Sequence, residues 1–462
     1  MSSSSYLRSC LKYTSATLLT LFTASMTAAT YYRPIPATTP TNNSTHTNTH
    51  SNDRRTTQSF CSPNSPPWNR DHVPLLLQWA RGISIGATTL AIRLVMNTYG
   101  RYEIREDVCY QRFLEAAIDA RREQQQQSIE SSSSSSQTTT SSSIPQQRGL
   151  LTVSNHRSLF DDPGILSCLL PLPIAIQPHH QRWEICSQEY CFNDALPSYI
   201  KGYIGAGQVL PICRGGGINQ QLLLDFGRHL ANGEWCHVFP EAGVWQWKEL
   251  GGRRELPVGA VWGSASDFKD DQQTDDASDN STNNNNNNSN NNNNNNKSVI
   301  IPATTAQRSL PPSPIGKLKW GVGKLIAHAP ITPRVIPFAH CGMERLLPQD
   351  EVSGKTYLRR DFVKSLLPSF LCNDSDSEGD GKGLRIQIQF GHEIKFDDLI
   401  EEHEEKHGKL WKYRGKEPTS ESNTTAIQQE NWVSSREERI LYSKITKRIE
   451  MHLEVLTKEV CR

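Results

Sequence analysis

The segment 155–163, which reads NHRSLFDDP, holds the first residues whose types and spacing could do chemistry. Four residues separate His156 from Asp161, and a turn between a strand end and a helix start can bring two such side chains together. A carboxylate beside an imidazole holds the ring in one tautomer and stabilises the imidazolium that forms when the ring takes a proton. His156 is therefore a candidate general base and Asp161 its orienter, acting on an alcohol that attacks an ester or thioester.

Asp162 is a candidate for a structural role, capping a helix, that differs from the role predicted for Asp161. Asp is a favoured N-cap and Pro a favoured first helical residue, so Asp162 and Pro163 predict the start of a helix that runs through residue 170. Because Asn also caps helices, we expect Asp162→Asn to be milder than Asp161→Asn.

Two further segments place polar groups after short apolar runs. Residues 235–243 read WCHVFPEAG, a strand that delivers Glu241 to its end, where the carboxylate could bind a polyol headgroup, bind an active-site donor or stand solvated in a turn. Residues 209–217 read VLPICRGGG. There Arg214 could make a bidentate phosphate contact and the glycines an anion-binding nest, the alternative being a plain surface turn.

Residues 335–343 predict a buried strand that leads into His340 and Cys341. These two residue types can bind metal, but no partner pair is spaced to complete a site. We therefore expect core structure here rather than a metal centre.

Together and in this order, these segments resemble the glycerolipid acyltransferase family, whose hallmark is N-H-x4-D followed by F-P-E-G. Segments 188–192, 209–218, 319–327 and 340–348 are similar to the tafazzin branch of that family, the phospholipid–lysophospholipid transacylases. The resemblance covers about residues 88–262 and 315–400. One departure is Ala242, which stands where the family usually has Gly.

The resemblance implies transfer of a fatty acyl chain from a phospholipid to a lysophospholipid such as monolysocardiolipin, with His156 as base and Asp161 as orienter. The implied reaction needs no cofactor and no metal. The implied substrate-binding residues are Arg214, Gly215, Gly216, Phe239, Pro240 and Glu241. Two alternatives stay open, an acyl-CoA-dependent lysophosphatidate or glycerol-phosphate acyltransferase and a non-catalytic membrane-associated scaffold with the same fold.

Strands and helices must alternate to position these residues, which is typical of the α/β class. Apolar patterns predict strands at 149–154, 174–177, 235–239, 334–339 and 385–390, and helices at 220–230, 318–328 and 436–460. We expect a central mixed sheet flanked by helices, like that of the glycerolipid acyltransferases, with disordered low-complexity insertions.

We expect the chain to be divided into eight segments. They are a targeting leader (1–33), a disordered linker (34–73), a membrane-interfacial helix with an N-terminal helical region (74–122), a Ser/Gln-rich disordered insertion (123–148), the first part of the acyltransferase domain (149–263), an Asn-rich disordered insertion (264–314), the second part of the domain (315–400) and a C-terminal helical region (401–462).

Composition narrows the function classes. The chain has 49 Lys and Arg against 48 Asp and Glu, a formal net charge of +1, which argues against a strongly basic nucleic-acid binder. Its 11 cysteines include no C-x-x-C pair, so we expect reduced, mostly buried thiols rather than a disulfide scaffold or zinc site. The partners implied are phospholipid and lysophospholipid substrates and a membrane surface.

The first 52 residues contain no Asp or Glu and carry Arg8, Lys12 and Arg33. This composition suits an organelle transit peptide, while the apolar stretch after Lys12 also suits a secretory signal. Residues 74–99 are apolar but interrupted by Arg81 and Arg93, which favours a helix lying in the membrane interface over a buried amphipathic helix. We expect peripheral attachment to a mitochondrial membrane, inner or outer, facing the intermembrane space.

Overall fold

The computed structural model of the chain describes residues 75–118, 148–193, 196–213, 216–244, 246, 314–348, 384–414 and 431–461. The predicted leader, the linker and nearly all of the two predicted insertions lie outside the described residues.

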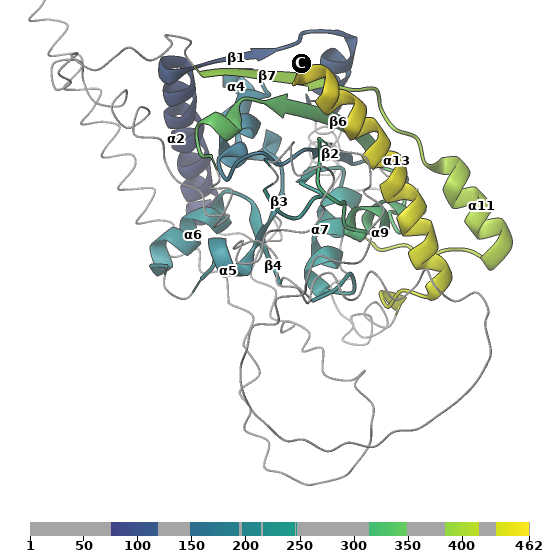
Figure 1. The fold of residues 1–462 in the computed structure, drawn as a ribbon. Helices are drawn as coiled ribbons and strands as arrows, with labels where there is room; N and C mark the ends of the chain where they lie inside the picture. Colours follow the sequence, from purple (N-terminus) through teal and green to yellow (C-terminus); the bar gives the residue numbers. More distant parts are fainter. Residues whose placement is uncertain are drawn as a thin grey trace, which may run out of the picture.

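Five strands form a central mixed sheet in the order β1-β7-β6-β2-β5 (Figure 1). Strand β2 is parallel to both of its neighbours, β5 and β6, while β7 runs antiparallel to β6 and parallel to β1. The predicted mixed sheet flanked by helices is thus confirmed. The strands are β1 (Gly100–Ile104), β2 (Leu150–Ser154), β5 (Trp235–Val238), β6 (Arg334–Cys341) and β7 (Leu384–Phe390).

Strand β2, which is paired on both edges, explains where the site lies. All five of its residues are buried, as expected for a strand covered on both faces and paired on both edges. Because β2, β5 and β6 are parallel, their carboxyl ends meet at one edge of the sheet. That edge is where ligands bind in open α/β sheets, and it gathers the segments that follow Ser154, Val238 and Cys341.

A second, two-stranded parallel sheet, β3 (Glu184–Ser187) with β4 (Val209–Ile212), was not predicted. The backbone of Trp183 joins it to β5, since its N–H donates to Trp235 O at 2.8 Å and its oxygen accepts from His237 N at 2.8 Å. Helices α5 (Gln188–Cys191) and α6 (Ser198–Ala206) lie between its strands in sequence. Cys186 and Cys191 are joined by a disulfide, so the expectation of reduced thiols is wrong for this pair.

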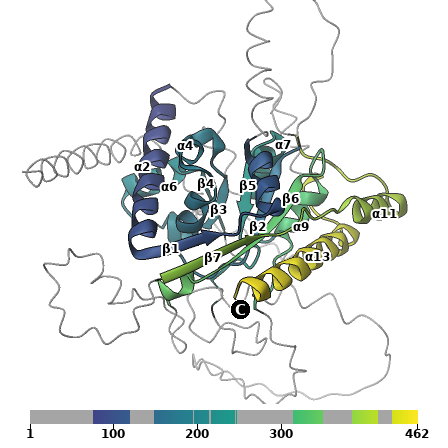
Figure 2. The ribbon, with the colours of Figure 1, turned by 90° about the horizontal axis from the view of Figure 1, so that it is seen from above.

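Helix α13 (Arg436–Val460) confirms the predicted long amphipathic helix and packs against α9 (Gly321–Ala327) and β6 (Figure 2). It begins with a capping box, in which the Ser435 hydroxyl and the Glu438 carboxylate each accept a backbone N–H of the other residue. Helices α7 (Gln221–Ala231) and α11 (Asp397–His407) complete this side of the molecule.

Helix α2 (Leu75–Tyr99) has the predicted helical conformation, but its two arginines point into the protein. Arg81 is 5% exposed, with its guanidinium carbon 5.4 Å from the centre of the Trp183 ring. Arg93 donates to the carbonyl oxygens of Ser167 and Leu170. Both arginines therefore contact protein groups in this structure. Of the helices in the described segments, none is both long and apolar enough to cross a bilayer.

Two local predictions are wrong. The helix expected to start at Asp162 is instead a π-helical turn, η2 (Asp161–Ile165), followed by a 3-10 turn, η3 (Leu166–Cys168). Asp162 has extended angles inside that turn (φ −110°, ψ 123°), and its carboxylate pairs with Arg182 instead of capping a helix. The strand expected at 174–177 is the end of a short helix, α4 (Leu172–Ala175), which Pro at its first turn favours.

Two glycines of α9 make a matched test of how closely α9 and α13 approach. A β-carbon on Gly323 would lie 2.5 Å from the Tyr442 carbonyl oxygen, whereas one on Gly321 would meet only a Leu223 methyl at 3.6 Å. We expect Gly323→Ala to lower the free energy of unfolding by about 1–3 kcal/mol, because rigid backbone must move. Gly321→Ala should change it by less than about 0.5 kcal/mol in the same denaturant titrations. Equal stability of the two variants would contradict the packing described here.

Candidate active site

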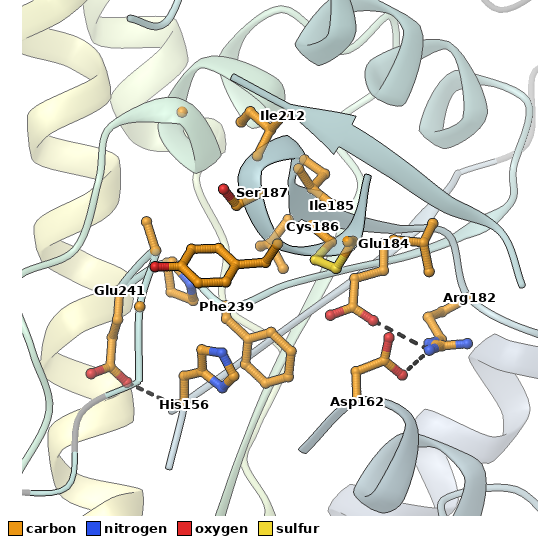
Figure 3. A pocket seen from close by; sticks show the side chains of 18 of the residues that line it. His156, Asp162, Arg182, Glu184, Ile185, Cys186, Ser187, Ile212, Phe239 and Glu241 are labelled. Carbon is orange, nitrogen blue, oxygen red and sulfur yellow. Dashed lines mark hydrogen bonds and ion pairs between the residues drawn. A yellow bond between two sulfur atoms is a disulfide. The ribbon is translucent and has the colours of Figure 1, made fainter. Parts of the chain in front are cut away.

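His156 and Asp161 are in contact at the carboxyl end of β2. Nδ1 of His156 lies 2.9 Å from Oδ2 of Asp161. Because a carboxylate only accepts hydrogen bonds, Nδ1 carries the proton, and the lone pair of Nε2 is left for a substrate. The imidazole lines a cavity of the described residues and stacks on the Phe239 ring with centroids 4.2 Å apart (Figure 3).

Asp161 organises the segment 155–161, which we call the His–Asp loop. Its side chain is fully buried, and Oδ2 also accepts the backbone N–H groups of Arg157 (2.6 Å) and Ser158 (2.8 Å). Nε2 of His340 lies 3.5 Å from the same oxygen. Three hydrogen bonds to this one oxygen compensate for the cost of burying the side chain.

Asn155 and His340 fasten the start of the loop to β6. The Asn155 carboxamide donates to the His340 carbonyl oxygen at 2.9 Å and accepts the His340 N–H at 3.0 Å, and His340 Nε2 lies 3.0 Å from the Asn155 carbonyl oxygen. Burial lowers the pKa of His340, so the ring is neutral at physiological pH. Among the described residues no group of three or more His, Cys, Asp or Glu is arranged to hold a metal ion.

Glu241 joins two parts of the site through its two oxygens. Oε1 accepts the His156 N–H at 2.8 Å and Oε2 accepts the Gly316 N–H at 2.6 Å. Burial raises the pKa of Glu241 to about 7, although both hydrogen bonds oppose this shift. Since backbone occupies both oxygens, the geometry favours a role in holding the site over direct binding of an acceptor polyol.

The next residue, Ala242, has a φ of 53°, in the left-handed region. This conformation suits glycine better than alanine, because a β-carbon crowds the following carbonyl oxygen there. The departure from the family pattern therefore keeps the left-handed turn at the cost of some backbone strain.

A second polar cluster lines the cavity, and sequence reasoning missed it. Nη2 of Arg182 donates to Asp162 Oδ1 and to Glu184 Oε2, the latter at 3.3 Å (Figure 3). Burial lowers the pKa of Arg182 and raises that of Glu184. The available signal was the pair of charges two residues apart at the start of an apolar strand, which places both side chains on one face.

The predicted anion nest is only partly described. Arg214 and Gly215 lie outside the described residues, so nothing is shown of their contacts. Gly216 lies in a turn closed by Gln220, whose carboxamide accepts from Cys213 N (3.0 Å) and donates to Gly217 O (2.8 Å). A β-carbon on Gly216 would lie 2.8 Å from that carboxamide, so this glycine gives room to Gln220.

The cavity itself has a volume of about 650 Å³ and is lined by both polar and apolar side chains. Phe239, Pro240 and Glu241 line it beside His156, and two half-buried lysines, Lys317 and Lys319, line it as well. Apolar side chains from both sheets, α7, α9 and the segments between them cover the rest, among them Ile185, Ile212, Ile218, Leu223, Val322 and Leu325. Such a cavity suits a ligand with a long apolar part and a polar reacting group.

Comparison with known proteins gives three informative relatives. The chain is 28% identical over 206 residues to an N-acylphosphatidylethanolamine synthase of Arabidopsis thaliana, which is 45% of this chain and 49% of that protein. It is 29% identical over 207 residues to tafazzin of Drosophila melanogaster, 45% of this chain and 36% of that protein. A third relative, named taffazin, from Dictyostelium discoideum, is 34% identical over 104 residues, 22% of this chain and 35% of that protein.

No protein-family profile matches the chain. The matched region spans about half or less of the length of each of these curated relatives. Their names nevertheless agree with the motifs around His156 and Glu241. These similarities support the assignment of the chain to the tafazzin and acyltransferase family.

Proposed function

We propose that this chain is a phospholipid acyltransferase that moves a fatty acyl chain from a phospholipid to a lysophospholipid such as monolysocardiolipin. The observation that carries the proposal is the hydrogen-bonded pair of His156 and Asp161 at the wall of a largely apolar cavity. The similarity to proteins named tafazzin supports this class of substrate.

The geometry supports base catalysis by His156. Nε2 of His156 takes the proton of the acceptor hydroxyl as that oxygen attacks the ester carbonyl of the donor. Asp161 stabilises the imidazolium, which then gives the proton to the departing glyceryl oxygen. One histidine can thus serve as base and acid in a single transfer, without an acyl-enzyme.

The remaining site residues hold the reacting groups in place. Glu241 fixes the His156 backbone and Phe239 packs against the imidazole, so both act as positioning residues. We assign the headgroup phosphate to Arg214 with Gly215 and Gly216, as the family resemblance implies. The cavity-lining lysine Lys319 is a further cation for that phosphate.

A second acceptor is favoured by one observation. The Arabidopsis relative is named as a synthase of N-acylphosphatidylethanolamine, in which an acyl group is bonded to nitrogen as an amide. An amine also loses a proton on acylation, so the same base would serve. Phosphatidylethanolamine is therefore the second candidate acceptor.

We further propose peripheral attachment to a mitochondrial membrane facing the intermembrane space. The acid-free first 52 residues and the similarity to tafazzins support the compartment. Exposed apolar side chains support contact with lipid, namely Leu90 and Leu94 on α2 and Leu159 and Phe160 in the His–Asp loop. A fluorescent fusion of residues 1–70 that enters the endoplasmic reticulum would contradict this location.

The decisive assay mixes purified full chain with phosphatidylcholine labelled in its acyl chain, with monolysocardiolipin and with phosphatidylethanolamine, with and without CoA. A parallel arm replaces the labelled phosphatidylcholine by acyl-CoA labelled in its acyl chain. We expect label in cardiolipin without CoA. A strict requirement for acyl-CoA would instead establish the acyl-CoA-dependent alternative, and label only in phosphatidylethanolamine would establish the amine acceptor. No transfer in any arm would contradict the proposal.

His156→Ala should abolish acyl transfer while leaving the fold intact. Loss of a general base costs about 10²–10⁴-fold in rate, and the imidazole is not part of the buried core. The matched control is His407→Ala, on the exposed end of α11, which should keep wild-type activity. Retention of more than roughly half of the activity in a folded His156→Ala protein would refute the mechanism.

Substitution of the two neighbouring aspartates should affect different properties, turnover for Asp161 and stability for Asp162. Asp161→Asn should lower turnover about 10³-fold or more, because the amide no longer stabilises the imidazolium. Asp162→Asn takes a charged partner from buried Arg182, so the earlier expectation of a mild effect is revised to a stability loss of about 3 kcal/mol. Turnover and denaturant unfolding of both variants separate the two effects, and a stable, active Asp162→Asn protein would contradict this role.

Glu241→Gln should change how stability depends on pH. In the unfolded chain Glu241 ionises near its ordinary pKa of 4.5, but in the folded chain near 7. The folded state thus holds this proton more tightly, and its contribution to stability is complete below pH 4.5 and is lost as the pH rises through about 7. Because Gln does not titrate, the stability of the variant relative to wild type should rise over that range, by up to about 3 kcal/mol. Parallel stability curves from denaturant titrations would contradict the assignment.

A further inference from the structure

Two thiols meet beside the His–Asp loop, one from β6 and one from the residue that follows α13. Cys341 is the last residue of β6 and packs against buried Leu456 and Val460 of α13. Cys461 comes directly after Val460. Sγ of Cys341 lies 3.5 Å from Oε1 of Glu344. The neighbouring Cys461 side chain, followed by burial and by Glu344, raises the pKa of Cys341.

Arg157 connects this pair of thiols to the catalytic groups. Its Nη2 lies 3.5 Å from Sγ of Cys461, and its side chain is buried. Its backbone N–H is one of the donors to Asp161 Oδ2, at 2.6 Å, and it directly follows His156. A guanidinium beside a sulfur stabilises the thiolate, which is the reactive form of cysteine.

Accessibility sets these two thiols apart from the other free cysteines of the described residues. Cys109, Cys168 and Cys236 are buried, whereas Cys341 and Cys461 are partly exposed. Cys213 is exposed, but it has no thiol neighbour among the described hydrogen bonds. A small oxidant can therefore reach a pair of thiols only at Cys341 and Cys461 within the described part of the chain.

We propose that Cys341 and Cys461 are an oxidation site at which a hydroperoxide converts the two thiols to a disulfide and slows the enzyme. The Cys461 thiolate attacks one peroxide oxygen, the O–O bond breaks, and the leaving hydroxide or alkoxide takes a proton, so that Cys461 becomes a sulfenic acid. The Cys341 sulfur then attacks the Cys461 sulfur, the S–O bond breaks, and water leaves as the S–S bond forms. Two electrons pass from the two sulfurs to one peroxide.

The disulfide acts on catalysis through Arg157, which is a positioning residue here. A disulfide sulfur carries no negative charge, so the buried guanidinium loses one of its partners. Any shift of Arg157 is passed to Asp161 through the 2.6 Å hydrogen bond and so to His156. This effect on rate rests on the proposed acyl transfer, whereas formation of the disulfide does not.

The experiment treats the purified full chain with hydrogen peroxide, blocks the remaining thiols and maps disulfide-linked peptides by mass spectrometry. We expect a Cys341–Cys461 link in wild type and in the control Cys109→Ser, and none in Cys341→Ser or Cys461→Ser. Dimedone should label Cys461 in the Cys341→Ser protein, because the sulfenic acid there has no partner thiol. Both cysteines remaining free in wild type would overturn the oxidation site.

Acyl transfer measured on the same samples tests the second half of the proposal. Wild type and Cys109→Ser should lose about tenfold in rate on oxidation, since small displacements of a catalytic group are costly, and recover with dithiothreitol. Cys461→Ser should not respond to peroxide. Full activity of the disulfide-linked protein would overturn the link to catalysis. Absence of transfer in the reduced protein would instead count against the proposed function, with the mapping still deciding the oxidation site.

Discussion

The buried carboxylate of Asp161 is the constraint on which the site depends. A carboxylate with no exposed surface needs hydrogen-bond donors that compensate for its burial. One imidazole and two consecutive backbone N–H groups meet on its Oδ2, which forces the chain from Asn155 to Asp161 into a tight loop. The orientation of His156 follows from that loop and requires no other contact to select its tautomer.

The rest of the sheet edge is built to keep this loop in place. Asn155 binds it to β6, and Glu241 binds it to the segment after β5 and to Gly316. Beneath it lies His237, whose pKa burial lowers well below the ordinary value and whose ring is therefore neutral. Because His237 and His340 are neutral, they add no positive charge that would oppose the imidazolium formed on His156 in the proposed proton transfer.

The adjacent residues Asp161 and Asp162 have identical side chains but different hydrogen-bond partners, and therefore different roles. Asp161 faces the loop backbone and His156, whereas Asp162 turns to Arg182 of the neighbouring segment. Arg182 in turn contacts Glu184, so that a small polar cluster forms part of a largely apolar cavity wall. The proposed lipid substrate would need this combination, because its chain is apolar while the bond that reacts is polar.

The sequence by itself determined the elements and contacts that depend on near neighbours. Strands β2, β5, β6 and β7 and helix α13 follow from local apolar patterns, and the contact of His156 with Asp161 spans only five residues. Only the tertiary structure decided that Asp162 pairs with a residue 20 positions away and that Glu241 binds the backbone of a residue 85 positions away. It also decided the pairing of β3 with β4. The physical reason is that a polar side chain takes whichever partner the packed chain brings within hydrogen-bond distance in a water-free interior, and local preferences such as helix capping are too weak to prevail against a buried charge.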